Sequence, residues 1–189
     1  IKIVDDSSNI EPKDVASVDV DAVKNRIQNG VDNDVNKFDP GDPNIVREYE
    51  VDEEHLDAVS VALKTNEDIT RVFKTLVLLN EKREMVVACI PGMEKLDLKK
   101  LGKLSGHKKF EMLPMKDLFS MTGYVRGGCS PILLKKRHSI FIHESALDNK
   151  TILVSGGLRG LQIEIEPQKL IDYLKMTVGD IIEDVNIEF

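Results

Sequence analysis

The sequence is poor in the residues that metal sites, stacking platforms and membrane spans require. It has no tryptophan and only 5% aromatic residues, which argues against a stacking platform for single-stranded nucleic acid. Its two cysteines, Cys89 and Cys129, form no CxxC pair, and its four histidines are scattered, so no metal-ligand spacing is present. No apolar run approaches the roughly 18 residues of a membrane-spanning helix. We therefore expect a protein that uses no metal or other cofactor and contacts no membrane.

Nucleotide-binding and acid–base signatures are missing as well. Neither GxxxxGK[ST] nor GxGxxG occurs, and no pair of carboxylates stands out as an acid–base couple. The N-terminal IKIVDDSSNIEPKD lacks the basic and apolar regions of a signal peptide. If the two cysteines are free thiols rather than a disulfide, this pattern predicts a cytoplasmic protein.

Negative charge is concentrated at the front of the chain. The formal net charge is −7, but 16 acidic and 6 basic residues precede Ala58, whereas 17 acidic and 20 basic residues follow from there. The body of the protein is therefore mildly basic, and a local basic face for nucleic acid can form on it.

Hydrophobic periodicity predicts interspersed strands and helices. At 189 residues the chain is long enough for one well-buried domain. We expect residues 1–17 to be an acidic, loosely attached lead-in and residues 18–189 to form a single domain. Predicted strands cover residues 45–51, 71–79, 85–90, 139–143, 151–155 and 161–165, and predicted helices cover 18–29, 53–65, 95–104, 114–121, 168–173 and 178–185. Hairpin-length links without a strict βαβ period indicate an α/β protein of the α+β type, with a mixed, largely antiparallel sheet or open barrel flanked by helices.

The most informative stretch is GYVRGGCSPILLKK, residues 123–136. Gly127 and Gly128 free the backbone for positive φ or for close approach to a ligand, and Pro131 fixes the exit from the turn. Such a loop can aim several backbone N–H groups at one carbonyl or phosphate oxygen, with basic residues on both sides. The alternative is an ordinary surface loop with a lysine tail.

Two side chains are candidates for chemistry. Lys74 lies inside the otherwise apolar strand VFKTLVLL, where a lysine either extends to solvent or contacts an anion, and Thr75 beside it offers a hydroxyl. Cys129 follows the glycines near Arg126, whose charge could lower the thiol pKa and produce a nucleophile. No histidine or carboxylate stands at a diagnostic spacing from Cys129, so the sequence leaves its role open. Cys89, within MVVACI, is typical of a small core residue.

Several segments resemble, in the same order, the YbaK/ProX family of aminoacyl-tRNA editing domains, which includes trans-acting relatives of the insertion domain of bacterial prolyl-tRNA synthetase. The matching segments are REYE at 47–50, VFKTLV at 72–77, KLDLKKL at 95–101, GYVRGGCSPILLKK at 123–136, VSGGLRGLQIEIEPQKL at 154–170 and VGDI near the end. The resemblance covers about residues 45–185. The combination of VFKTLV, YVRGGCSP and SGGxRGLxIE is specific.

The resemblance implies an enzyme that hydrolyses the ester between a wrong amino acid and tRNA(Pro), typically cysteine or alanine, without a cofactor. Its partners would be the aminoacylated 3′ end of the tRNA and prolyl-tRNA synthetase. Lys74 would be the catalytic signature lysine that holds the 3′-terminal adenosine or its phosphate. Backbone donors of the glycine-rich loop would hold the aminoacyl carbonyl. The substrate-binding residues implied are Tyr49, Thr75, Gly127, Gly128, Cys129, Ser130, Pro131, Ser155, Gly156 and Gln162.

Two positions depart from the family's pattern. FIHESA carries His143 where many members have aspartate, and Gln162 stands where some cysteine deacylases have aspartate. A glutamine still accepts a hydrogen bond but carries no charge, so selectivity for the amino acid can differ accordingly. We expect a trans-acting deacylase of mischarged tRNA(Pro), above all of Cys-tRNA(Pro), in which the substrate's own thiol can serve as nucleophile. The alternative is a non-catalytic binding module that keeps the fold for an aminoacyl or nucleotide-like ligand.

Overall fold

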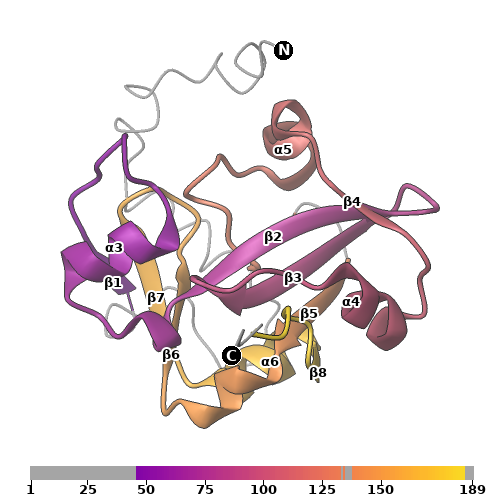
Figure 1. Ribbon diagram of the computed structural model, residues 1–189. Coiled ribbons are helices and arrows are strands. Elements are labelled where there is room, and N and C mark those ends of the chain that lie inside the picture. Colours follow the sequence, from indigo (N-terminus) through magenta and orange to yellow (C-terminus); the bar gives the residue numbers. More distant parts are fainter. Residues whose placement is uncertain (1–45, 133, 135–137, 186–189) are drawn as a thin grey trace.

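The computed structural model describes residues 46–132, 134 and 138–185 (Figure 1). In chain order the elements are β1 (Val46–Glu48), α3 (Ala58–Thr65), the short 3₁₀ helix η1 (Ile69–Arg71), β2 (Phe73–Asn80), β3 (Met85–Pro91), α4 (Leu98–Ser105), β4 (Phe110–Met112), α5 (Met115–Thr122), β5 (Ser139–His143), the 3₁₀ helix η2 (Glu144–Asp148), β6 (Ile152–Ser155), β7 (Leu161–Ile165), α6 (Pro167–Leu174) and β8 (Thr177–Gly179).

The strands form two sheets that meet along one edge. Five strands follow the order β4-β2-β3-β5-β8, and three follow the order β1-β7-β6. The β3–β5 and β5–β8 pairs are parallel, and the other paired strands are antiparallel. A parallel bridge between Val72, just before β2, and Leu153 in β6 joins the two sheets. The strands in the described part of the chain do not close into a barrel, which confirms the mixed, largely antiparallel and open architecture.

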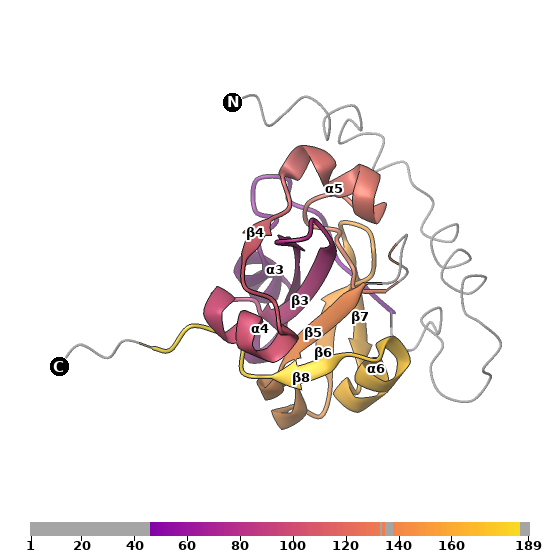
Figure 2. The same cartoon turned by 90° about the vertical axis from the view of Figure 1, so that its right-hand side faces the viewer.

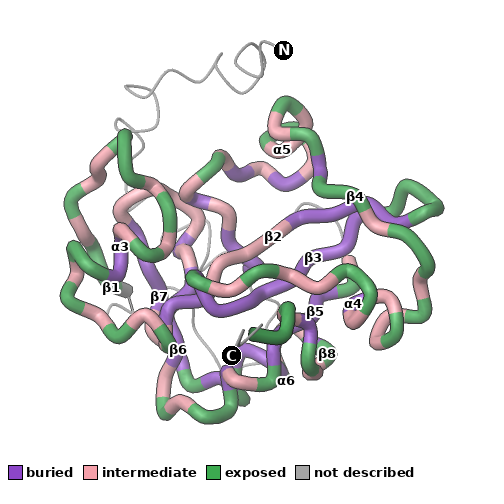
Figure 3. Tube along the Cα trace, viewed as in Figure 1, coloured by how far each residue is buried: buried purple, intermediate pink, exposed green. Residues whose placement is uncertain are grey.

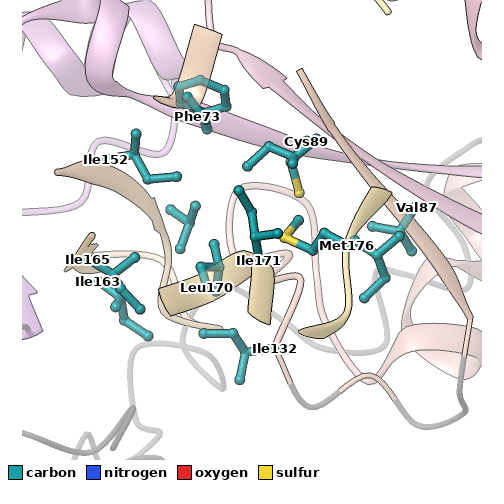
Figure 4. Close-up of a cluster of buried hydrophobic side chains, with 14 residues drawn as sticks. Phe73, Val87, Cys89, Ile132, Ile152, Ile163, Ile165, Leu170, Ile171 and Met176 are labelled. Carbon is teal, nitrogen blue, oxygen red and sulfur yellow. The ribbon is translucent and has the colours of Figure 1, made fainter. Parts of the chain in front are cut away.

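Both faces of the central strands are covered, because apolar side chains alternate to either side of them. The largest buried cluster brings together Phe73 from β2, Cys89 from β3, Ile163 from β7 and Leu170 from α6 (Figure 4). On the opposite face of β3, a second cluster packs under α4 around Leu101. Helices α4 and α6 therefore flank the strands from opposite sides (Figure 2), and buried residues concentrate along the strands (Figure 3). The prediction of Cys89 as a core residue is confirmed.

Aspartate caps decide where two helices begin. The Asp57 carboxylate accepts a hydrogen bond from the Ser60 backbone N–H at 2.9 Å, so α3 begins at Ala58 and not at residue 53. In the same way the Asp97 carboxylate accepts from the backbone of the first turn of α4. Each cap satisfies N–H groups that lack an acceptor within the helix.

The C-terminal segment differs from its prediction. The apolar spacing of residues 178–185 suggested a helix, but residues 177–179 form β8, parallel to β5. Ile182 then bridges to Leu96, and Ile181 is fully buried in the cluster under α4. Pairing with the open edge of β5 outweighs the helical periodicity of a short segment.

Strand β4 was not predicted from the sequence, and it pairs with the end of β2. The lead-in at 1–17 and the predicted helix at 18–29 lie outside the described residues. None of the helices that the structure describes is long and apolar enough to cross a membrane.

Candidate active site

A row of polar residues crosses three neighbouring strands on one face of the fold. The bridge between Val72 and Leu153 places both side chains in the apolar cluster beside α3. Two residues further along each strand, on the same face, stand Lys74 of β2 and Ser155 of β6. Ser155 is the register partner of Gln162 in β7. Lys74, Ser155 and Gln162 therefore form one line near the turn that joins β6 to β7.

Lys74 carries an ammonium group that no anion of the described residues contacts directly. Burial lowers the pKa of this half-buried lysine, and the more distant charges of Glu94 and Asp57 partly oppose the shift. Lys74 makes no hydrogen bond or ion pair with any residue that the structure describes. A half-buried ammonium that lacks a hydrogen-bond partner can bind a phosphate or carbonyl oxygen of a ligand.

Gln162 is the second polar member of the row whose side chain has no hydrogen-bond partner among the described residues. Its side chain is 6% exposed and makes no hydrogen bond within the described ranges. An amide without such a partner can both donate to and accept from a ligand. The Ser155 hydroxyl differs, because it accepts a hydrogen bond from the Gly157 backbone N–H at 3.3 Å and so shapes the following turn.

Helix α5 leads directly into the glycine-rich loop. The helix ends at Gly123, whose φ of 82° lies in the left-handed region and whose N–H donates to the Phe119 carbonyl at 2.8 Å. The hydroxyl of Tyr124 then donates to the Ile132 carbonyl, which ties the two ends of the loop together. Tyr124 is buried, so the loop is anchored from beneath.

In the turn of this loop one backbone N–H is hydrogen-bonded, and three others have no acceptor among the described residues. The Gly128 N–H donates to the Val125 carbonyl at 3.0 Å, and Gly127 between them has a φ of 82°. The N–H groups of Gly127, Cys129 and Ser130 have no acceptor among the described residues. Backbone N–H groups in folded proteins are seldom left unpaired, so three such donors within four residues offer a site for a ligand oxygen.

The loop packs tightly on the turn between β6 and β7. A Cβ atom on Gly128 would lie 3.1 Å from the backbone of Leu158 and Arg159. A Cβ atom on Gly157, which has a φ of 99°, would lie 2.9 Å from the ring of Tyr124. Glycine is required at Gly128 because two backbones approach each other, and at Gly157 because the backbone has a positive φ and lies against the Tyr124 ring. The two glycine-rich segments are thus brought together beside the polar row.

Tyr49 and Gly156 lie at the same turn. The Tyr49 backbone N–H donates to the Gly160 carbonyl at 2.9 Å, and the Gly156 N–H donates to the Leu161 carbonyl at 2.8 Å. Burial raises the pKa of the Tyr49 phenol, opposed by the Gly160 backbone and the positive charge of Arg159. Both residues therefore belong to the neighbourhood of the row.

Thr75 and Cys129 lie elsewhere. Because side chains alternate along β2, Thr75 points to the face opposite Lys74, where its hydroxyl is 3.8 Å from the Cys89 sulfur. The Cys129 side chain packs against the apolar cluster that includes Val77. Thr75 and the Cys129 thiol are thus not brought together with the row, although the Cys129 backbone is part of the loop.

Ser130 and Pro131 complete the loop as buried residues. The Ser130 hydroxyl accepts a hydrogen bond from the Ile132 backbone N–H at 3.1 Å, which turns the chain back into the core. The side chain of Ser130 therefore shapes the loop, whereas its backbone N–H has no acceptor among the described residues.

The sequence left open whether Arg126 lowers the pKa of the Cys129 thiol, and the structure shows the opposite direction. Burial raises the pKa of the thiol to about 12, and Arg126 is exposed to solvent. Burial disfavours the thiolate, the reactive form of cysteine, so Cys129 lacks the environment of a nucleophile.

His143 has a structural contact. Its Nδ1 accepts a hydrogen bond from the Ser145 backbone N–H at 3.2 Å, which caps η2, and its Nε2 is 3.4 Å from the Asp180 carboxylate. His143 therefore caps η2, a role that an aspartate can also perform.

The sequence analysis missed Arg159, which connects three segments of the site. Its Nε donates to the Arg126 carbonyl at 2.9 Å, and its Nη1 donates to the Glu53 carboxylate at 2.6 Å. The only signal in the sequence was the arginine within GGLRG, and its contacts lie 33 and 106 residues away along the chain.

Comparison with known proteins defines the class of protein to which this fold and site belong. A model of the family described as "Aminoacyl-tRNA editing domain" matches residues 52–173. This range includes Lys74, the glycine-rich loop and the row through Gln162. The chain belongs to the aminoacyl-tRNA editing domain family.

Individual relatives agree with this assignment. The chain is 49% identical over 139 residues to EbsC of Enterococcus faecalis, named as a candidate Cys-tRNA(Pro)/Cys-tRNA(Cys) deacylase, across 72% of this chain and 83% of the relative. The fold is similar to the crystal structure of a candidate trans-editing enzyme for prolyl-tRNA synthetase, with a TM-score of 0.70, 20% identity and coverage of 86% and 98% of the two chains. It is also similar to the hypothetical protein APE2540, with a TM-score of 0.67, 21% identity and coverage of 73% and 90%.

Proposed function

We propose that this protein is an aminoacyl-tRNA deacylase that hydrolyses mischarged tRNA(Pro), with Cys-tRNA(Pro) as its main substrate. The observation that carries the proposal is the 49% identity with EbsC over 139 residues, 72% of this chain. The candidate deacylase activity in the name of that relative agrees with family membership from residue 52 to 173. The arrangement of Lys74 and the glycine-rich loop supplies a physical account of ester hydrolysis.

Lys74 would anchor the tRNA end. Its ammonium is half-buried, has a lowered pKa and has no described partner, so a phosphate or ribose oxygen of the 3′-terminal adenosine would provide the missing interaction. Ser155 and Gln162 continue the row away from Lys74, and the Gln162 amide would accept or donate a hydrogen bond to the aminoacyl group.

The N–H groups of Gly127, Cys129 and Ser130, which have no acceptor among the described residues, would hold the ester carbonyl. In the tetrahedral transition state this carbonyl oxygen becomes negatively charged. Backbone donors that are fixed in advance stabilise that charge more than they stabilise the ground-state ester. Removing one such donor typically costs about 10²–10³ in rate.

The attacking group would come from the substrate or from water. In Cys-tRNA the cysteine sulfur would bond to its own ester carbonyl carbon, and the bond from that carbon to the ribose oxygen would break. The thiol proton would pass to the departing ribose oxygen, leaving a thiolactone and free tRNA. In Ala-tRNA a water would attack the same carbon and yield free alanine. Neither route requires the buried Cys129 thiol.

Selection of tRNA(Pro) would be shared with prolyl-tRNA synthetase. The chain has 189 residues, and the editing domain alone offers little surface for reading a whole tRNA. A complex with the synthetase would deliver the acceptor end to the row at Lys74.

The decisive experiment measures loss of the ester from Cys-, Ala- and Pro-charged tRNA(Pro) and from Cys-charged tRNA(Cys), each with and without prolyl-tRNA synthetase. We expect fast loss of cysteine from tRNA(Pro), slower loss of alanine, and no loss of proline above the spontaneous rate. Binding without any deacylation would instead identify a non-catalytic module and refute the proposal.

A further inference from the structure

Arg159 joins the glycine-rich loop to two other segments of the described structure. It lies in the turn between β6 and β7, and only 16% of its side chain is exposed. Its Nε donates to the carbonyl oxygen of Arg126, and its Nη1 pairs with Glu53. One guanidinium therefore links this turn, the glycine-rich loop and the segment that leads into α3.

The bond to Arg126 sets the direction of a specific peptide group. In a trans peptide the carbonyl oxygen of one residue and the N–H of the next point in opposite directions. Because the Arg159 guanidinium binds the carbonyl oxygen of Arg126, the N–H of Gly127 points away from Arg159. That N–H is one of the three donors without an acceptor among the described residues.

A second constraint acts on the next residue. The backbone of Leu158 and Arg159 lies so close to Gly128 that a Cβ atom there would be 3.1 Å away. The guanidinium and the backbone of the same turn thus fix two consecutive residues of the loop. The Glu53 carboxylate in turn binds the Arg159 guanidinium. A lysine cannot reproduce these contacts, because it lacks the rigid planar arrangement of donors of the guanidinium.

We infer that Arg159 is a positioning residue that orients the Arg126–Gly127 peptide and so preorganises the donors of the glycine-rich loop. The inference rests on the proposed function for its effect on catalysis, but its effect on the loop is independent of any activity. Arg159 does not touch the substrate in this role. Its loss would act through the loop, and a misplacement of about 1 Å can cost about 100-fold in rate.

Arg71 provides a matched control at the other end of the β6–β7 hairpin. Its Nε also donates to a backbone carbonyl, that of Thr151 at 3.1 Å, and its guanidinium also pairs with glutamates, Glu67 and Glu164. Arg159→Lys and Arg71→Lys therefore remove the same kind of interaction from a similarly buried arginine. Only the first affects the loop.

The test compares amide hydrogen exchange of residues 124–132 in the full chain and in both variants. We expect faster exchange in Arg159→Lys and unchanged exchange in Arg71→Lys. In the Cys-tRNA(Pro) assay, Arg159→Lys should lower kcat about 100-fold with KM nearly unchanged, whereas Arg71→Lys should keep kcat. Unchanged exchange in Arg159→Lys, or a raised KM with normal kcat, would overturn the positioning role.

Two further outcomes keep the test decisive. If the unmodified protein deacylates none of the charged tRNAs, the proposed function fails, and the exchange comparison alone decides whether Arg159 orders the loop. If Arg159→Lys does not fold, Glu53→Gln removes only the charge that holds the guanidinium. It should raise exchange in the same loop by a smaller amount, and an unchanged loop in that variant counts against the inference.

Discussion

Lys74 and Lys100 show what distinguishes the candidate site from the rest of the molecule. Both are partly buried lysines. Lys100 of α4 lies between two carboxylates, 2.8 Å from Asp180 and 2.7 Å from Asp184, and these hydrogen bonds raise its pKa. Lys74 has no such partner in the described part of the chain, and burial lowers its pKa.

This difference separates a stabilising contact from a site that is ready for a ligand. Lys100 holds the segment after β8 against α4, and its charge is already neutralised by the protein. The charge of Lys74 is only partly offset, by Glu94 and Asp57, so its burial has a free-energy cost that a bound anion or carbonyl oxygen would reduce. Lys74 should therefore matter for activity, and Lys100 for stability.

The largest expected effect comes from Lys74→Ala. Loss of the ammonium removes the anchor for the tRNA end, so we expect kcat/KM for Cys-tRNA(Pro) to fall by about 10²–10³. The free energy of unfolding should change by no more than about 1 kcal/mol, because no fixed partner is lost. Ester loss under initial-rate conditions and urea unfolding measure the two quantities.

Lys100→Ala is the matched control. It removes the ammonium that binds both Asp180 and Asp184, so the urea midpoint should fall while kcat/KM stays close to that of the unmodified protein. If the two variants exchanged these outcomes, the comparison between the lysines would be refuted.

Gly128→Ala should have the next largest effect. Its Cβ would lie 3.1 Å from the backbone of Leu158 and Arg159, so the loop must shift and we expect kcat to fall by about tenfold or more. The crowding should cost about 1–3 kcal/mol of stability. Gly106→Ala in the C-cap of α4 is the control, because its φ of 78° strains an alanine by about 1–2 kcal/mol without touching the site. Equal losses of kcat in both variants would show that instability alone causes the effect.

The pH dependence offers a finer measure of Lys74. Its pKa in the folded protein lies below the ordinary value of 10.5, so kcat/KM should decline as pH rises through this lowered pKa, by about tenfold per unit beyond it. The unfolded chain binds this proton more tightly, so stability should increase with pH between the lowered and the ordinary pKa. Rates corrected for spontaneous ester decay, and urea unfolding at the same pH values, measure both effects.

The variant Lys74→Arg tests whether Lys74 or another titrating group causes the decline of kcat/KM at high pH. A guanidinium stays charged, so the alkaline decline should move to higher pH even where the absolute rate is lower. A decline that stayed in place would assign it to a different group.

The sequence predicted the elements whose local pattern agrees with their tertiary setting. The apolar strands β2 and β3 and the glycine-rich loop are of this kind, because strand composition and turn chemistry act over a few residues. The segment at 178–185 was predicted as a helix, since its spacing does not reveal the open edge of β5 that pairs with β8. Arg159 could not be found, because its partners Arg126 and Glu53 are distant in sequence. The burial of Cys129 likewise depends on packing between separate segments.

Cys129→Ala should have the smallest effect, and it tests whether the loop acts through its backbone or through its thiol. Burial raises the pKa of this thiol to about 12, so almost no thiolate exists at neutral pH. The backbone N–H at residue 129 is the same in alanine, so kcat/KM for Cys-tRNA(Pro) and Ala-tRNA(Pro) should remain within about threefold. Removing a small buried side chain should cost only about 1 kcal/mol of stability. If Cys129→Ala lost as much activity as Lys74→Ala, a covalent route through the protein's own sulfur would replace the mechanism proposed above.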